Sequence, residues 1–496
     1  MKLKYLSTAM VLATLPATGA FAAALDRSGQ SMSAFFQPGN YFEAGISVLD
    51  PTVDGKEAGK TPAPHDKIED MADDYYFPTA ALKLQFNDMF SFGLLYDQPF
   101  GAAATYSGDN IFVANSKSKA FSAIQEAGIR AQLEAAGIKQ NTPAAIKNFA
   151  DAKLGGDLAL AQTMYDNNAD LGGGLKLKDY LDAEVARKVK AGVQTNINNV
   201  DKAVQGATGG THVDVDTENL SMIFGLSPIK NVTLYAGPVY QIVKGDVNLR
   251  GEAYSVYNGY DLHIKDTDGW GWLVGAAYQI PEIALKASLT YRSKIDHDVK
   301  NAGETGYGAL ASLSPVHAAA IANIDNSSGT TTITTPQSVN LDLQSGIMAN
   351  TVAFANIRWV NWKDFSIQPF KFGQVSNLVK PGVGFNLVEY SDDQYSVTTG
   401  VGRKLNEKWA GNVSVGYDTG AGNPVSTLGP TEGYWNVGLG VQYSPTPATF
   451  IAGGVKYFWL GDAKAQTGAQ SGTNEYVASF EDNNAIAYGL KLGYRF

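Results

Sequence analysis

The chain has 496 residues, with 38 Lys and Arg against 48 Asp and Glu, no cysteine and only five histidines. Apolar residues make up 44% of it, which excludes a wholly disordered chain. The formal charge of −10 becomes −12 if Lys2 and Lys4 leave with a signal peptide, and no other basic cluster occurs, so we expect no nucleic-acid partner. Without cysteine there are no disulfides, thiolate nucleophiles or Cys-ligated metals, and we expect no metal site and no cofactor.

Residues 1–22 have the pattern of a signal peptide. Lys2 and Lys4 precede an apolar stretch at 5–15, and small residues at 20–22 form a cleavage site, which we place after Ala22. A membrane anchor would need about 20 apolar residues, and Pro16 interrupts this stretch. The mature chain is therefore expected to be periplasmic, secreted or an outer-membrane barrel.

The last strand of the sequence favours the barrel. Apolar and aromatic residues at 486, 488, 490, 492, 494 and 496 alternate with small and cationic ones, so one face suits lipid and the other a polar interior. A half-buried strand of a soluble sandwich has the same period. The terminal aromatic, Phe496, resembles the signal read by the barrel-assembly machinery, which is thus an expected partner.

The pattern returns along the chain and predicts a complete barrel. Short turns at 87–88, 227–230, 279–282, 347–350, 406–407 and 444–446 alternate with long polar segments. The predicted strands span 40–49, 78–86, 89–98, 213–226, 231–247, 262–279, 283–295, 338–347, 350–362, 393–404, 408–418, 432–444, 449–460 and 482–496. The fold class is therefore all-β, a transmembrane antiparallel β-barrel of about 14 strands in the bacterial outer membrane, with residues 41–496 forming the barrel and both termini in the periplasm.

The connection at 99–212 is predicted to be a helical extracellular insertion. A stripe of apolar residues at spacings of three and four indicates one amphipathic helix: Leu181, Val185, Val189, Val193, Ile197, Val200 and Val204. Phe121, Ile124 and Leu133 suggest another, and Thr142-Pro143 is a plausible helix start. These stripes either pack on one another and cap the barrel, or form a surface groove that collects hydrophobic substrate.

Several stretches resemble the outer-membrane long-chain fatty acid and hydrocarbon transporters of the FadL type (OmpP1/FadL/TodX-like). They are 266–272 (DTDGWGW), 287–293 (ASLTYRS), 359–365 (WVNWKDF), 408–418 and 434–443. The resemblance covers most of the predicted strands 4 to 14. It implies a monomeric 14-stranded barrel, an N-terminal hatch in the lumen, a surface site and a deeper site for cargo, and lateral release at a kinked third strand.

Two departures from that family concern the hatch and the insertion. Only residues 23–40 precede the first strand, and the family's Asn-Pro-Ala hatch motif is absent, so we expect a shorter plug. Arg27, Ser28, Phe35 and Phe36 are its candidates to enter the lumen, although an extended leader along the barrel floor fits equally. The helices also precede the fourth strand, whereas the best-known members carry theirs in later loops.

Alternation predicts which charged residues face the lumen: Glu43, Lys83, Asp97, Lys286, Arg292, Arg358, Asp418, Lys456, Lys491 and Arg495. Arg292 and Arg358 fall in the outer half and are candidates to bind a cargo carboxylate, with Lys363 and Lys371 acting earlier at the surface. The alternative is that these charges only form lumenal ion pairs.

Strand 3 is the candidate lateral gate. Phe100 stands with Phe92 and Tyr96 in an aromatic cluster around this strand, and Pro99 and Gly101 interrupt its upper end. Proline removes a ladder hydrogen bond, so this end either opens sideways or simply leads into a loop.

We therefore predict passive uptake of hydrophobic compounds, most of all long-chain fatty acids, by a monomeric barrel surrounded by outer-membrane lipid. The sequence leaves open whether the cargo is a fatty acid, an alkane or an aromatic hydrocarbon. No histidine lies in a recognisable catalytic motif, so no enzyme is expected. An aqueous porin and a surface adhesin on the same barrel are the alternatives.

Overall fold

The computed structural model describes residues 25–60, 65–115 and 117–496; the predicted signal peptide lies outside them. Fourteen antiparallel strands form a closed barrel. They are β1 (Tyr41–Thr52), β4 (Tyr75–Gln85), β5 (Phe90–Asp97), β9 (His212–Ile229), β10 (Val232–Leu249), β11 (Tyr260–Ile280), β12 (Leu285–Arg292), β16 (Ser338–Met348), β17 (Thr351–Val360), β20 (Gln394–Lys404), β21 (Trp409–Asp418), β23 (Tyr434–Tyr443), β24 (Thr449–Leu460) and β27 (Asn484–Arg495). This confirms the predicted barrel strand by strand.

Each strand alternates between a lipid-facing side and a lumenal side, as the sequence predicted. On β21, Trp409, Val413 and Tyr417 are exposed on the outside, whereas Ser414 and Asp418 are buried inside. Aromatic pairs mark both edges of the outer band: Trp409 and Tyr443 have ring centroids 4.8 Å apart at one end, and Tyr417 and Trp435 are 4.6 Å apart at the other. Such girdles lie at the two membrane interfaces of an outer-membrane barrel.

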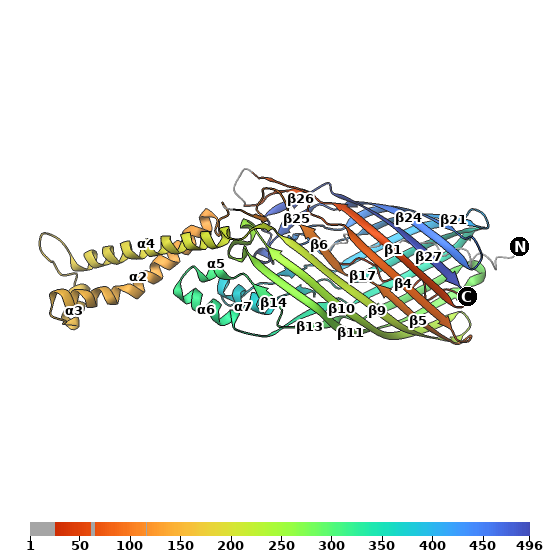
Figure 1. Cartoon of the computed structure of the whole chain (residues 1–496), viewed down its shortest axis with the longest axis horizontal. Coiled ribbons are helices and arrows are strands. Elements are labelled where there is room, and N and C mark those ends of the chain that lie inside the picture. The colour runs from red at the N-terminus through yellow and green to blue at the C-terminus, as the bar shows by residue number, and fades with distance from the viewer. Residues whose placement is uncertain (1–24, 61–64, 116) are drawn as a thin grey trace.

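Short turns lie at the end of the barrel that carries the C-terminus, and the long loops at the other (Figure 1). In the barrel sheet, β6 (Gly101–Thr105) pairs with β9 beyond the end of β5. The loops add short elements over the outer end: β2 (Gly55–Glu57), β3 (Lys67–Ile68), β7 (Val113–Ala114), β8 (Gly209–Gly210), β13 (Ile295–Lys300), β14 (Gly303–Thr305), β15 (Thr330–Thr335), β18 (Ser366–Ile367), β19 (Val388–Glu389), β22 (Val425–Ser426), β25 (Ala463–Gln466) and β26 (Ala478–Phe480). The helices α5 (Gly308–Ala311), α6 (Pro315–Asp325) and α7 (Phe370–Val379) and the 3-10 turns η2 (Glu252–Tyr257) and η4 (Gly468–Gln470) lie there too, whereas η3 (Pro281–Ile283) is in a short turn. Their apolar side chains form one large buried cluster.

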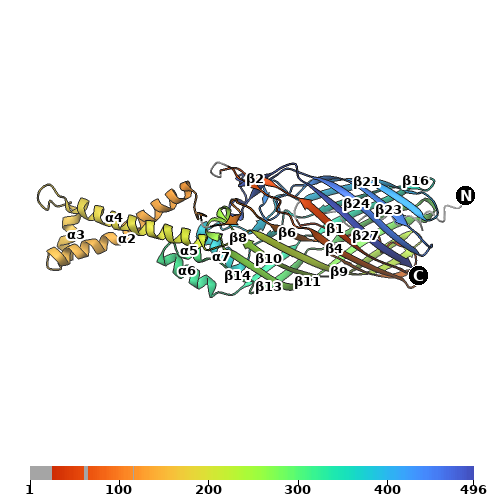
Figure 2. The same ribbon diagram turned by 45° about the horizontal axis from the view of Figure 1, so that its top comes forward.

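The insertion forms a helical arm that projects away from the outer end (Figures 1 and 2). It consists of α2 (Ala123–Lys153), α3 (Leu158–Asp166) and α4 (Leu177–Gln205). All seven residues of the predicted α4 stripe are buried, so the stripe packs within the arm and on the cap. Among the described residues, no helix is long and apolar enough to cross a membrane.

The predicted helix start at Thr142-Pro143 is wrong, because Pro143 lies inside α2. The helix begins one residue after Ser122, whose side chain accepts from the Gln125 N–H in a capping box. Around Pro143, the Thr142 hydroxyl bonds the Ile138 carbonyl at 2.9 Å. Packing of α2 on α4 holds the helix together across a proline that would normally end it.

Topology predicts which sites a reagent can reach from outside the cell. Since the chain has no cysteine, Gly173→Cys at the tip of the arm and Glu407→Cys in a short turn each provide a single thiol. We expect an impermeant maleimide to label the first on intact cells and the second only after the outer membrane is opened. Reversed labelling would contradict the orientation.

Candidate functional site

Residues 25–40, which we call the lumenal segment, run inside the barrel before β1 begins. The segment bonds to inward side chains of strands on opposite sides: Asn340 donates to the Gly29 carbonyl at 2.7 Å, and Lys83 donates to the Gln37 carbonyl at 2.5 Å. Met32 and Phe35 are buried among lumenal side chains. The segment therefore crosses the lumen instead of lying along its floor.

A buried ion pair fixes the outer end of this segment. Arg358 on β17 donates from Nε to Asp26 Oδ2 at 2.6 Å and from its second terminal nitrogen to Asp26 Oδ1 at 3.1 Å. Both side chains are only 3% exposed. Asn340, Gln30 and Ser338 accept the other three guanidinium hydrogens at 2.7, 3.2 and 3.4 Å. The guanidinium is thus fully occupied within the protein, in the bidentate geometry that suits a carboxylate.

Arg292 faces the same segment with weaker contacts. It donates to Ser221 Oγ at 3.0 Å and approaches the Gln30 carbonyl and Met32 Sδ at 3.5 Å each, while its Nε has no hydrogen-bond partner. Ser28 donates to Asp97 Oδ2 on β5 at 2.6 Å.

Phe35 and Phe36 anchor the inner part of the segment. Both rings pack against Tyr235, with centroids 5.7 and 5.4 Å away. Phe35 fits because Gly93 and Gly225 face it: a Cβ on either would lie within 2.8 Å of its ring. Such clashes would displace the ring, so these two glycines make room for the segment.

The third strand is interrupted beside this segment. It ends as β5 at Asp97 and resumes as β6 at Gly101, and β4 pairs with β5 only over Ala80–Gln85. The lumenal segment pairs with the break: the Arg27 N–H donates to the Pro99 carbonyl at 2.6 Å, and the Gly101 N–H to the Leu25 carbonyl at 2.9 Å.

Arg27 fills the space between β4 and β6. Its guanidinium lies 3.5 Å from the centroid of the Tyr75 ring on β4 and donates to the Tyr75 hydroxyl at 2.7 Å. A further hydrogen bond runs from its Nε to the Gly101 carbonyl. The Arg27 side chain thus bridges β4 and β6 where the edges of these two strands are not paired with each other.

An apolar cavity of about 50 Å³ lies above the segment, in the outer lumen. Phe100 and Trp362 form an edge-to-face pair in its wall, with centroids 5.6 Å apart. The rest of the lining is mostly aliphatic and aromatic: Leu25, Ala102, Val213, Val215, Thr217, Val243, Val247, Leu262, Ile264, Ile333, Thr335, Phe365, Ile367, Leu387, Val388, Tyr390, Ser426, Leu428 and Gly429. No charged side chain lines it among the described residues.

The structure brings only part of the predicted site together. Phe100 lines the cavity and Arg358 holds the lumenal segment, but Lys363 is exposed on a loop and the Lys371 ammonium donates to the Asp325 carbonyl at 2.8 Å. Asp26 could not be predicted from the sequence, because its partner Arg358 lies 332 residues away.

One further carboxyl group lies near this network, in the loop before β23. Burial and, to a lesser extent, the nearby Asp418 carboxylate raise the pKa of Glu432 to about 7. The Gly422 N–H donates to this carboxyl at 3.1 Å. Glu432 is therefore partly protonated at neutral pH, which limits repulsion between the two acids.

Removing Asp26 should loosen the segment. In Asp26→Ala, Arg358 keeps its charge in a buried site without its counter-ion, at a cost of about 3–5 kcal/mol. We expect higher single-channel conductance in planar bilayers. Ser31→Ala, which removes an exposed hydroxyl of the same segment, is the matched control and should conduct like the unaltered protein. Equal conductance of Asp26→Ala and the control would show that other contacts suffice to hold the segment.

Comparisons with known proteins identify the barrel. Residues 258–496 match the model of the family described as "Outer membrane protein transport protein (OMPP1/FadL/TodX)". No curated protein matches.

Two solved structures share the fold. A Pseudomonas aeruginosa FadL homologue has 13% identity and a TM-score of 0.56, with 94% of this chain and 92% of that one covered. The Pseudomonas putida toluene transporter TodX has 12% identity and a TM-score of 0.51, with 97% of each chain covered. Residues 258–496 therefore match the OMPP1/FadL/TodX family of outer-membrane transport proteins, and the barrel as a whole shares its fold with these two structures.

Proposed function

We propose that this transporter takes up hydrophobic small molecules passively, as a monomer assembled by the barrel-assembly machinery and embedded in outer-membrane lipid. Cargo enters the apolar cavity from the loops, the lumenal segment shifts, and cargo leaves sideways at the break in strand 3. The observation that carries this proposal is the position of Phe100, which lines the cavity and also lies in the break.

The chemistry of the cavity supports a hydrophobic cargo. Its lining exposes hardly any polar surface, so burying apolar cargo there gains roughly 25 cal/mol per Å² removed from water. At about 50 Å³ it is far smaller than the roughly 300–1,000 Å³ of occupied ligand sites, so side chains must move apart as cargo enters.

Neutral hydrocarbons suit this cavity better than fatty acids. A buried carboxylate needs a partner, and the guanidinium of Arg358 already binds Asp26. Long-chain fatty acids are the second candidate, because Arg358 visibly accommodates a carboxylate in bidentate geometry. An acid would have to replace Asp26, whereas a hydrocarbon would not.

A porin or an adhesin has less support. A porin needs an open aqueous lumen, and here the lumenal segment and its partners occupy it. The helical arm is the part of the chain that an adhesin would use, but the apolar cavity has no role in adhesion.

Filling the cavity should block uptake. Ala102 on β6 is 7% exposed and lines the cavity, so Ala102→Trp overfills it at a cost of roughly 1–3 kcal/mol. We expect uptake of radiolabelled toluene by cells to fall about tenfold or more. Ala236→Trp, which places the same bulk on the lipid-facing side of β10, is the control and should transport normally.

Paired cargoes distinguish the two candidates. Arg292→Ala and Arg358→Ala should reduce uptake of hexadecanoic acid but spare hexadecane if the acid is bound through an arginine. Equal losses of uptake for both cargoes would show that the arginines only hold the lumenal segment.

If Ala102→Trp left uptake of every cargo unchanged, the cavity would not lie on the transport path.

A further inference from the structure

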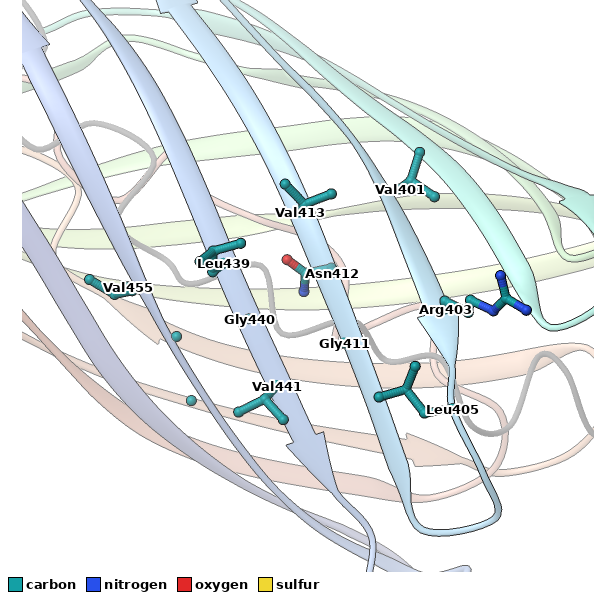
Figure 3. Close-up of a pocket in the computed structure, with 12 residues that line it drawn as sticks. Val401, Arg403, Leu405, Gly411, Asn412, Val413, Leu439, Gly440, Val441 and Val455 are labelled. Atoms are coloured by element: carbon teal, nitrogen blue, oxygen red, sulfur yellow. The ribbon is translucent and has the colours of Figure 1, made fainter.

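A groove crosses the lipid-facing surface of β20, β21, β23 and β24, on the far side of the barrel wall from the lumen. It has a volume of about 560 Å³, within the range of small-molecule sites. In Figure 3, Val413, Val441 and Leu439 project around Gly411, and Arg403 lies at one edge, beside the turn between β20 and β21. None of these residues belongs to the transport path described above.

Missing side chains create the groove. Gly411 pairs with Val441, and Val441 pairs on its other side with Gly453, so one lipid-facing row across three strands carries a single side chain. A Cβ built on Gly411 would meet only a carbonyl oxygen at 3.4 Å, and one on Gly453 would meet the Gly489 oxygen at 3.3 Å. The space above both glycines is thus open to the bilayer. Aliphatic walls around a hollow of this kind fit an extended hydrocarbon chain.

Arg403 places a positive charge at the periplasmic end of this groove. It pairs with Gly411 on the strand next to it, two residues nearer the bilayer centre than Trp409 of the periplasmic girdle. Its side chain is exposed and has no hydrogen bond or ion pair within the described part of the chain. Among the lipid-facing positions of β20, β21, β23, β24 and β27, all of them described, it is the one charged residue. A lipid-facing arginine is costly unless its charge reaches the polar interface, where the lipid phosphates lie.

We propose that this groove binds one anionic glycerophospholipid of the periplasmic leaflet, with its phosphate on Arg403 and one acyl chain lying over Gly411, Val441 and Gly453. The charge and the apolar groove match the two parts of such a lipid and are adjacent on the same face. A free phosphate would satisfy Arg403 but leave the groove unfilled. A neutral lipid would fill the groove without pairing Arg403.

Native mass spectrometry of the full-length mature protein in mild detergent, with added phosphatidylglycerol, tests this site. We expect one lipid to remain bound at activation energies that strip the others. Arg403→Gln should weaken its binding about fivefold, and Gly411→Leu, which fills the groove, should abolish it. Diacylglycerol with the same acyl chains should bind no better to the unaltered protein than to Arg403→Gln, and inorganic phosphate should not compete.

Matched variants control for general effects of charge and bulk. Lys230→Gln removes an exposed cation from another short turn, and Ala236→Leu adds bulk to the lipid-facing side of β10. Both should retain the lipid, and far-ultraviolet circular dichroism should show an intact barrel in every variant. The proposal is overturned if Arg403→Gln or Gly411→Leu binds the lipid as the unaltered protein does, if the controls lose it equally, or if the groove instead yields a dimer of this chain.

Discussion

Within a membrane, a backbone N–H or C=O without a hydrogen-bond partner is costly, and the whole architecture follows from that constraint. A closed ring of strands satisfies it along most of the wall. At the break in strand 3, however, Pro99 supplies no N–H and β4 loses its neighbour. The lumenal segment supplies backbone hydrogen bonds at this break, since residues 25 and 27 pair with residues 101 and 99. The segment that occupies the lumen is thus also the segment that completes the wall.

This double role explains why a buried ion pair holds the segment. Asp26 is the residue between the two backbone hydrogen bonds, so its pairing with Arg358 fixes the register of residues 25–27 against the break. Buried ion pairs often add little net stability, but they penalise alternative arrangements because either charge left alone is unfavourable. In the transport that we propose, the lumen and the lateral opening therefore open together, when the segment leaves both.

The sequence predicted the barrel well because lipid imposes a strict alternation on every strand. Arg292, Arg358, Lys456 and Lys491 all face the lumen, as alternation required. Alternation reports which way a side chain points but not which distant residue it meets, so the partnership of Asp26 with Arg358 could not be derived. The helix start predicted at Pro143 was wrong for a related reason: packing between α2 and α4 outweighs the tendency of a proline to interrupt a helix. The groove beside Arg403 could not be predicted from the sequence either, because it depends on glycines from separate strands lying in one row.

A reversible covalent lock tests the central claim, that the lumenal segment must leave the strand break for cargo to pass. Asp26 and Phe100 form a bridge pair, whose close backbone spacing suits a disulfide, and the chain has no other cysteine. In Asp26→Cys/Phe100→Cys cells, with each single variant as control, we predict that toluene uptake stops when the disulfide forms and returns when a reductant breaks it. Uptake that is unchanged by the disulfide, once mass spectrometry has confirmed its formation, would contradict the account.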